Sequence, residues 1–165
     1  MLGMSLSTFT FVHVLISLVG IASGLIVLYG FLADKRMDGL TALFLTTTVL
    51  TSVTGFMFPF EHFSPADTFG VISLVVLTIA IAARYAFHLA GGWRTTFVVT
   101  SALALYLNCF VAVVQSFLKI PALHALAPQG KEPPFLLAQL VVFLIFVVLT
   151  ILAAKKFRVQ SGQAA

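Results

Sequence analysis

Long apolar stretches alternate with short polar ones along the whole chain. A helix rises about 1.5 Å per residue, so about twenty apolar residues cross the roughly 30 Å hydrocarbon core of a bilayer. Five stretches of this kind predict transmembrane helices at residues 11–32, 41–60, 68–90, 95–118 and 135–154. The segment 119–134 holds four prolines and predicts a stiff, largely non-helical loop. The pattern therefore predicts an all-α polytopic membrane bundle that forms a single domain.

The second predicted helix, TALFLTTTVLTSVTGFMFPF, carries seven Thr or Ser residues in an otherwise apolar sequence. Thr41, Thr48, Ser52 and Gly55 fall in one narrow sector of its surface. Lipid tails do not explain such a stripe, whereas small and hydroxyl-bearing residues are enriched where membrane helices contact one another. Two other helices carry similar polar faces: His13, Ser17, Gly20 and Gly24 in the first, and Ser101, Asn108 and Gln115 in the fourth. The pattern leaves open whether these faces meet in one cavity or pair off separately.

Composition agrees with a membrane protein. The chain of 165 residues is 61% hydrophobic and 8% charged, with 17 Phe and a mean hydropathy of +1.14. A soluble domain has about 25% charged residues, so a soluble fold is excluded. The single cysteine, Cys109, lies in an apolar run and offers neither an intramolecular disulfide nor a thiolate metal cluster.

The positive charges predict the orientation of the chain in the membrane. Seven of the nine Lys and Arg residues lie on one side of the predicted spans: Lys35, Arg36, Arg84, Arg94, Lys155, Lys156 and Arg158. Lys119 and Lys131 lie on the other side. Because cytoplasmic loops carry the excess of Lys and Arg, we expect the N-terminus outside and the C-terminus in the cytoplasm. The net charge of +4 is thereby explained without a nucleic-acid partner.

With this orientation, polar residues gather in the outer part of the bundle. The candidate pocket or ligand residues are His13, Thr54, His62, Asn108, Gln115 and Gln139. Two antiparallel helices could present His13 and His62 to a haem, and these two histidines with His124 and one or two carboxylates could hold a metal ion. The simpler interpretation is that these residues bond to water, to backbone carbonyls or to neighbouring helices.

A second polar cluster is expected on the cytoplasmic side, at Arg84, His88 and Arg94. Arg84 and His88 are one helical turn apart and share a face with Gly70 and Ser73, which predicts that this face points inward. Anchoring at the interface explains such residues. The alternative is a contact with a lipid phosphate or with the carboxylate of Asp34 or Asp38.

Several catalytic signatures are absent from the sequence. It contains no phosphate-binding glycine loop, no HExxH, no CxxC and no nucleophile elbow. No acidic residue lies in the middle of a predicted span, where an ion-coupled transporter would carry its proton or sodium site. These absences argue against an enzyme or an ion-driven pump.

Three segments of the chain carry a resemblance: TSVTGFMFPF, ARYAFHLAGGWR, and the series ALYLN, VQSFLKIPAL and LAP. In these segments the chain resembles a group of short bacterial inner-membrane proteins with about five transmembrane helices. The resemblance covers most of the chain and implies an inner-membrane location. It carries over no activity and no catalytic residue. A looser likeness to small helical membrane proteins that hold haem rests on His13 alone and carries over no ligand.

The sequence favours a non-enzymatic accessory or structural component of the inner membrane. Two alternatives are open: a redox or ligand-binding protein that holds haem, a metal ion or a quinone in the outer pocket, and a permease for a small neutral solute. The fifth helix has no polar face apart from Gln139 and Thr150, which predicts a peripheral position. Expected partners are the lipid bilayer and either another membrane protein or further copies of this chain.

Overall fold

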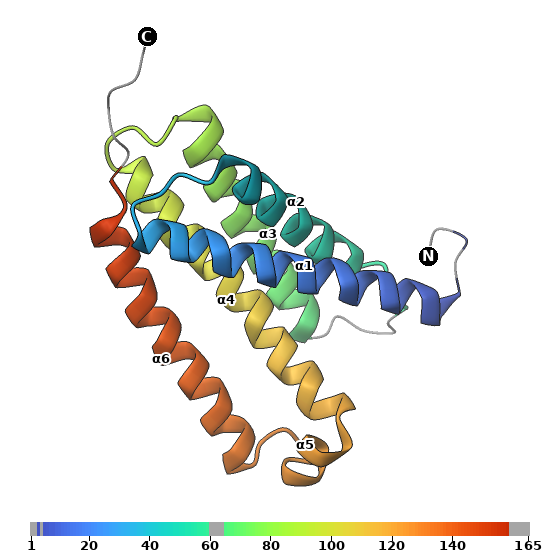
Figure 1. Ribbon diagram of the computed structural model, residues 1–165. Coiled ribbons are helices and arrows are strands. Elements are labelled where there is room, and N and C mark those ends of the chain that lie inside the picture. The colour runs from blue at the N-terminus through green and yellow to red at the C-terminus, as the bar shows by residue number, and fades with distance from the viewer. Residues whose placement is uncertain (1–2, 4, 60–64, 159–165) are drawn as a thin grey trace.

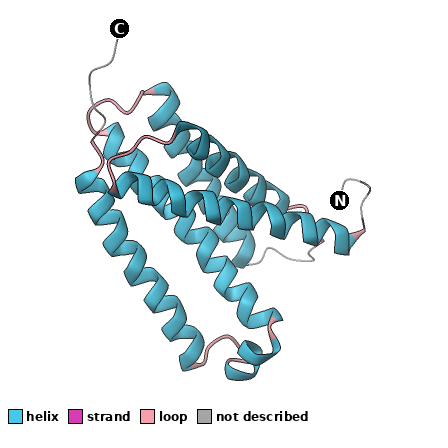
Figure 2. Ribbon diagram, in the orientation of Figure 1, coloured by secondary structure: helices cyan, strands magenta, loops and turns pink. Residues whose placement is uncertain are grey.

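The computed structural model describes residues 3, 5–59 and 65–158, and the structure is helical almost throughout (Figure 1). The elements are α1 (Leu6–Leu32), α2 (Asp38–Gly55), α3 (Pro65–Ile81), the π-helical turn η1 (Ala82–Ala86), α4 (Trp93–Lys119), α5 (Pro121–Leu126) and α6 (Pro133–Lys156). Figure 2 shows helices joined by short loops, and the described residues contain no strand. The predicted all-α class is confirmed.

Four of the described helices are long and apolar enough to cross a membrane: α1, α3 continued through η1, α4 and α6. The second predicted span, 41–60, corresponds to α2, which runs from Asp38 to Gly55 and is not among the four. Its seven Thr and Ser residues and Asp38 lower its hydropathy. The helix ends shortly before Pro59, whose ring and missing N–H oppose its continuation.

The expectation of a non-helical loop at 119–134 is wrong for residues 121–126, which form α5. Pro121 begins this helix and Pro133 begins α6. Proline is compatible with the first turn of a helix, because the N–H that it lacks would have no intrahelical partner there. Between the two helices, the Glu132 carboxylate accepts the backbone N–H groups of Gln129 and Lys131 at 3.1 and 2.9 Å.

The helices pack most tightly at the end of the bundle that carries the loop between α1 and α2. There α1, α2 and α4 meet around Gly24, where an added Cβ would lie 2.6 Å from Leu105 Cδ1 and 2.8 Å from the Phe44 ring. Figure 1 shows α1 and α6 close together at this end and far apart at their other ends. Gly24 therefore lies in the densely packed half of the molecule, and the other half is more open.

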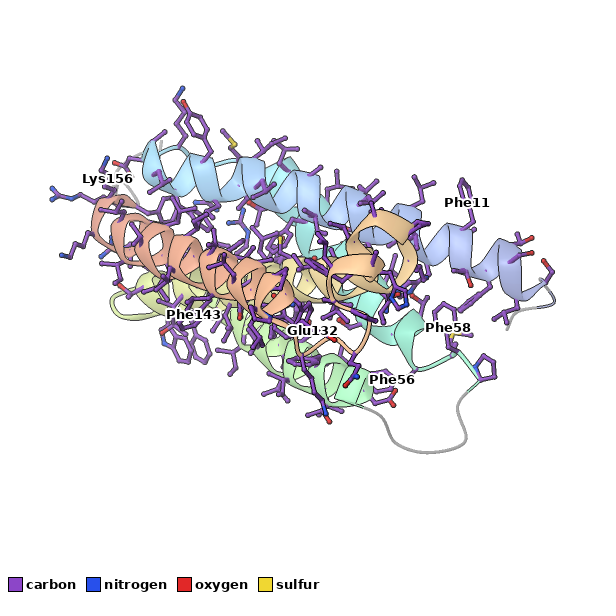
Figure 3. The ribbon with its side chains drawn as sticks, turned by 90° about the horizontal axis from the view of Figure 1, so that it is seen from below. Phe11, Phe56, Phe58, Glu132, Phe143 and Lys156 are labelled. Atoms are coloured by element: carbon purple, nitrogen blue, oxygen red, sulfur yellow. The ribbon has the colours of Figure 1, made fainter. Side chains whose placement is uncertain are left out.

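Helix α6 packs against α4 and α1 but is the most exposed of the four candidate spans, as the sequence predicted for its peripheral position. Its C-terminal end is tied to the tight end of the bundle by two polar contacts. Arg94 donates to the Phe157 carbonyl, and the Arg158 backbone N–H donates to the Asp34 carboxylate at 2.6 Å. Figure 3 shows Lys156 at this end, opposite Phe11 and Phe58, so the C-terminal end of α6 lies far from the N-terminal half of α1.

Candidate functional site

A cavity of about 750 Å³ lies in the open half of the bundle, between α1, α2, α3 and α4. Most of its wall is apolar, and its polar lining includes His13, Ser17, Ser52, Asn108, Gln115 and Lys119. Asn108 and Lys119 are eleven positions apart on α4, so the cavity extends about 16 Å along that helix. Gln115 and Lys119 are exposed, which places the opening at the helix ends. Part of each polar face of α1, α2 and α4 therefore lines one cavity: His13 and Ser17, Thr48 and Ser52, and Asn108 and Gln115.

The inner end of the cavity is formed by Ser17 and Asn108. The Ser17 hydroxyl donates to Asn108 Oδ1 at 3.1 Å, and Asn108 is 8% exposed. Its Nδ2 is buried and has no hydrogen-bond partner among the residues that the structure describes, and an added Cβ on Gly20 would lie 3.3 Å from it. One turn further along α1, the tight packing around Gly24 closes the cavity.

His13 forms part of the wall, nearer to the opening. Its Nδ1 lies 2.8 Å from Thr54 Oγ1, and its ring stands edge-on to Phe58 with a centroid distance of 5.1 Å and an interplanar angle of 89°. Phe58 also contacts Phe9, at a centroid distance of 5.0 Å. Figure 3 shows Phe58 at the end of the molecule away from Lys156. A hydrogen bond and an aromatic contact thus fix the imidazole ring.

The opposite wall joins α2 to α3. The Ser52 and Ser73 hydroxyls lie 3.1 Å apart, and both side chains are buried. Beside them Phe56 covers Gly70, where an added Cβ would lie 2.8 Å from the ring. This contact explains a glycine at position 70, since any side chain there would displace Phe56 from the cavity wall.

The structure brings most of the predicted pocket residues together. His13, Asn108 and Gln115 line the cavity, and Thr54 holds His13 from outside the lining. Gln139 does not line it: its Nε2 donates to the Phe110 carbonyl at 3.2 Å, which joins α6 to α4. His62 lies outside the described residues.

Two charged residues of the lining were not among the predicted pocket residues. Asp67, at the start of α3, is buried, and Lys119 is the last residue of α4. In the sequence, Lys119 contributed only to the predicted orientation in the membrane. The position of Asp67 along the chain gives no sign that it lies near the polar faces of α1, α2 and α4. Because α3 and α4 are antiparallel neighbours, the start of α3 and the end of α4 lie at the same opening of the cavity.

The three residues of the predicted cytoplasmic-side cluster, Arg84, His88 and Arg94, have different surroundings in the structure. Arg84 is buried, as expected for a residue on the inward face, and it donates to the Asp38 carboxylate. The helix, however, ends at η1, where the Phe87 N–H donates to the Ala82 carbonyl at 3.0 Å. His88 follows this end with a φ of 48° and is exposed. The prediction that it shares a face with Arg84 is wrong because the regular helix does not reach it.

Arg84 and Asp38 form an ion pair at the tight end. The Arg84 guanidinium also lies over the rings of Phe97 and Tyr85, at 5.4 and 5.5 Å. Arg36 donates a second hydrogen bond to Asp38 at 2.7 Å. The hydrogen bond from Arg36, together with that from Arg84, holds the pKa of Asp38 below its usual value.

Comparison of the chain with protein-family models, with curated proteins and with solved structures finds no match. The cavity must therefore be interpreted from its own chemistry. Among the side chains that the structure describes, no three His, Cys, Asp or Glu residues come together as ligands for a metal ion. A haem or metal site that includes His62 remains a prediction.

Proposed function

We propose that this chain is a multi-pass membrane protein that binds a small, mainly apolar molecule in the cavity between α1, α2, α3 and α4. The observation that carries the proposal is the cavity itself. Its volume of about 750 Å³ lies within the roughly 300–1,000 Å³ that is typical of small-molecule sites. The surface of its wall is mostly apolar, which is also typical of such sites.

The proposal includes five membrane spans, with α2 as the fifth. The hydroxyls of α2 donate to carbonyls of the preceding turn, such as Thr48 to Phe44 at 2.7 Å and Thr51 to Thr47 at 2.9 Å. A helix whose hydroxyls are satisfied internally is compatible with an apolar environment. Five spans and the distribution of Lys and Arg favour an outer N-terminus, a cytoplasmic C-terminus and a cavity that opens outward. The resemblance to bacterial inner-membrane proteins supports that membrane as its location.

The cavity favours ligand binding over the other functions that the sequence left open. An accessory or structural role does not require a cavity in the bundle. A permease needs a path through the protein, whereas the packing of Gly24 against Leu105 and Phe44 closes the inner end. If a small neutral solute crossed proteoliposomes at a rate that Asn108→Leu abolished, the permease alternative would be preferred.

The test compares the small molecules that co-purify with three forms of the protein in mild detergent. Gly55 lines the cavity, and a Cβ there meets nothing within 4 Å, so Gly55→Leu fills the cavity without a clash on its first atom. Gly39 is the matched control, because it also lies in α2, has open space around a Cβ, and does not line the cavity. Mass spectrometry of each protein and of its organic extract measures the bound molecule.

We expect one small molecule per chain in the wild type and in Gly39→Leu, and at least a tenfold loss in Gly55→Leu. An empty wild-type protein, or equal occupancy in a folded Gly55→Leu protein, would overturn the proposal. Circular dichroism checks that both variants fold. An absorption spectrum and a metal analysis of the same samples test the haem and metal alternatives. A Soret band or a stoichiometric metal that His13→Asn removes would favour them.

A further inference from the structure

The hydroxyl of Thr54 determines which nitrogen of His13 carries a hydrogen. Thr54 Oγ1 lies 2.7 Å from the Leu50 carbonyl, four residues earlier in α2. A hydroxyl has one hydrogen, and a carbonyl oxygen can only accept it. Thr54 therefore donates to Leu50, as Thr47 donates to Leu43 at the same distance. Its oxygen is left to accept a hydrogen bond from His13 Nδ1.

His13 consequently presents a bare ring nitrogen. When Nδ1 of a neutral imidazole carries the hydrogen, Nε2 is an acceptor. Nε2 has no hydrogen-bond partner among the described residues, although His13 lines the cavity and is only partly exposed. Thr54 and Phe58 hold the ring from two sides, so the acceptor keeps a fixed position in the wall.

The charges of the lining favour a neutral ligand. Asp67 and Lys119 have opposite charges, and both line the cavity. Among the lining residues that the structure describes, neither sign of charge is in excess, so they do not favour an ion. Most of the remaining wall is apolar, as at Val14, Leu18 and Val111. We infer that the cavity takes a neutral, mainly apolar alcohol or phenol, whose hydroxyl donates a hydrogen bond to His13 Nε2. This inference rests on the proposed function.

Two probes of nearly the same shape test this ligand class. 2-Naphthol has a hydroxyl that donates, and 2-methoxynaphthalene has a methyl ether at the same position that cannot. Binding of each is measured with the protein in lipid nanodiscs, and binding to empty nanodiscs is subtracted. One hydrogen bond changes affinity by roughly two- to tenfold, so we expect 2-naphthol to bind about fivefold more tightly than the ether.

Variants at position 13 connect this preference to Nε2. In His13→Asn the side-chain NH₂ can still donate to Thr54, while the amide oxygen lies nearer the backbone than Nε2 and does not reach its position. We expect this variant to lose the fivefold preference by weakening the binding of 2-naphthol, with the affinity for the ether unchanged. His124→Asn is the control, because His124 is exposed in α5 and does not line the cavity. It should keep the preference.

Each remaining result overturns the inference. Equal affinity for the two probes in the wild type would do so, as would a preference that survives in His13→Asn or the failure of both probes to bind. These results are separate from a failure of the proposed function, which depends on the molecule that co-purifies and on Gly55→Leu. If Gly55→Leu blocks both probes and the wild type does not distinguish them, the cavity binds ligands but His13 does not select a hydroxyl.

Discussion

Arg84 in η1 and Asp38 at the first position of α2 form an ion pair that joins the end of α3 to the start of its neighbour. The two partners differ in exposure: the Arg84 side chain is 5% exposed and that of Asp38 is 63% exposed. Within the described part of the chain, the buried Arg84 Nε has no hydrogen-bond partner, and the guanidinium lies over the Phe97 ring. The buried cation therefore depends on a carboxylate that reaches it from the surface.

Asp38→Asn should destabilise the protein by about 1–2 kcal/mol. The substitution leaves the buried Arg84 without a negative partner, and the exposure of Asp38 keeps the loss below that of a fully buried pair. Arg36→Gln is the control, because Arg36 also pairs with Asp38 but is itself 56% exposed. It should cost less than about 0.5 kcal/mol. Unfolding in mixed detergent micelles measures both, and equal losses would contradict the prediction.

The same ion pair predicts a pH dependence of stability. The pKa of Asp38 is lowered in the folded protein, first by the hydrogen bond from Arg36 and then by that from Arg84. A carboxyl whose pKa is lower in the folded than in the unfolded state stabilises the fold above its unfolded pKa and loses this contribution as the pH falls through the folded value. We expect stability to fall below about pH 4, and to fall less in Asp38→Asn. Parallel curves for the two proteins would contradict this.

The close approach of helices at Gly24 gives a test of the tight half. Gly24→Ala places a Cβ against Leu105 and Phe44, which are both about 1% exposed and have little room to move. We expect a loss of about 1–3 kcal/mol, typical of overpacking. Gly39→Ala, with nothing within 4 Å of the new atom, should gain up to about 1 kcal/mol from helix propensity. Thermal unfolding of the two variants compares them, and a stable Gly24→Ala protein would show that the contact is loose.

Hydrophobic patterning predicted the long helices because each stretch is apolar over its whole length. It placed their ends less well. Helix α1 begins after Ser5, whose side chain caps it, and not at the first unbroken apolar run. The end of α3 was predicted too late, because the π-helical turn and the positive φ of His88 have no signal in a pattern of apolar residues.

The candidate site was predicted where spacing along one helix was enough. The offsets of His13, Ser17 and Gly20 place them on one face, and that face lines or borders the cavity. Gln139 was grouped with them by its depth alone. Depth does not say which neighbour a helix faces, and α6 presents Gln139 to Phe110 on the other side of α4. The order of helices in space is a property of the whole bundle, so one helix could not reveal it.

The hydrogen bond between His13 and Thr54 predicts the tautomer of the imidazole in the empty protein. Nitrogen-15 NMR of protein labelled at histidine distinguishes a protonated ring nitrogen from a bare one. We expect Nδ1 protonated and Nε2 bare, because Thr54 has already donated its hydrogen to Leu50.

Thr54→Val separates this cause from an intrinsic preference of the ring. Valine has nearly the shape of threonine but cannot accept the hydrogen bond, so the variant should lose the bias toward a protonated Nδ1. His88 and His124 are exposed and serve as internal references in the same spectrum. A wild-type His13 with its hydrogen on Nε2 would reverse the direction of its hydrogen bond with Thr54. The cavity would then offer a donor at this position, and its ligand would need an acceptor such as a carbonyl.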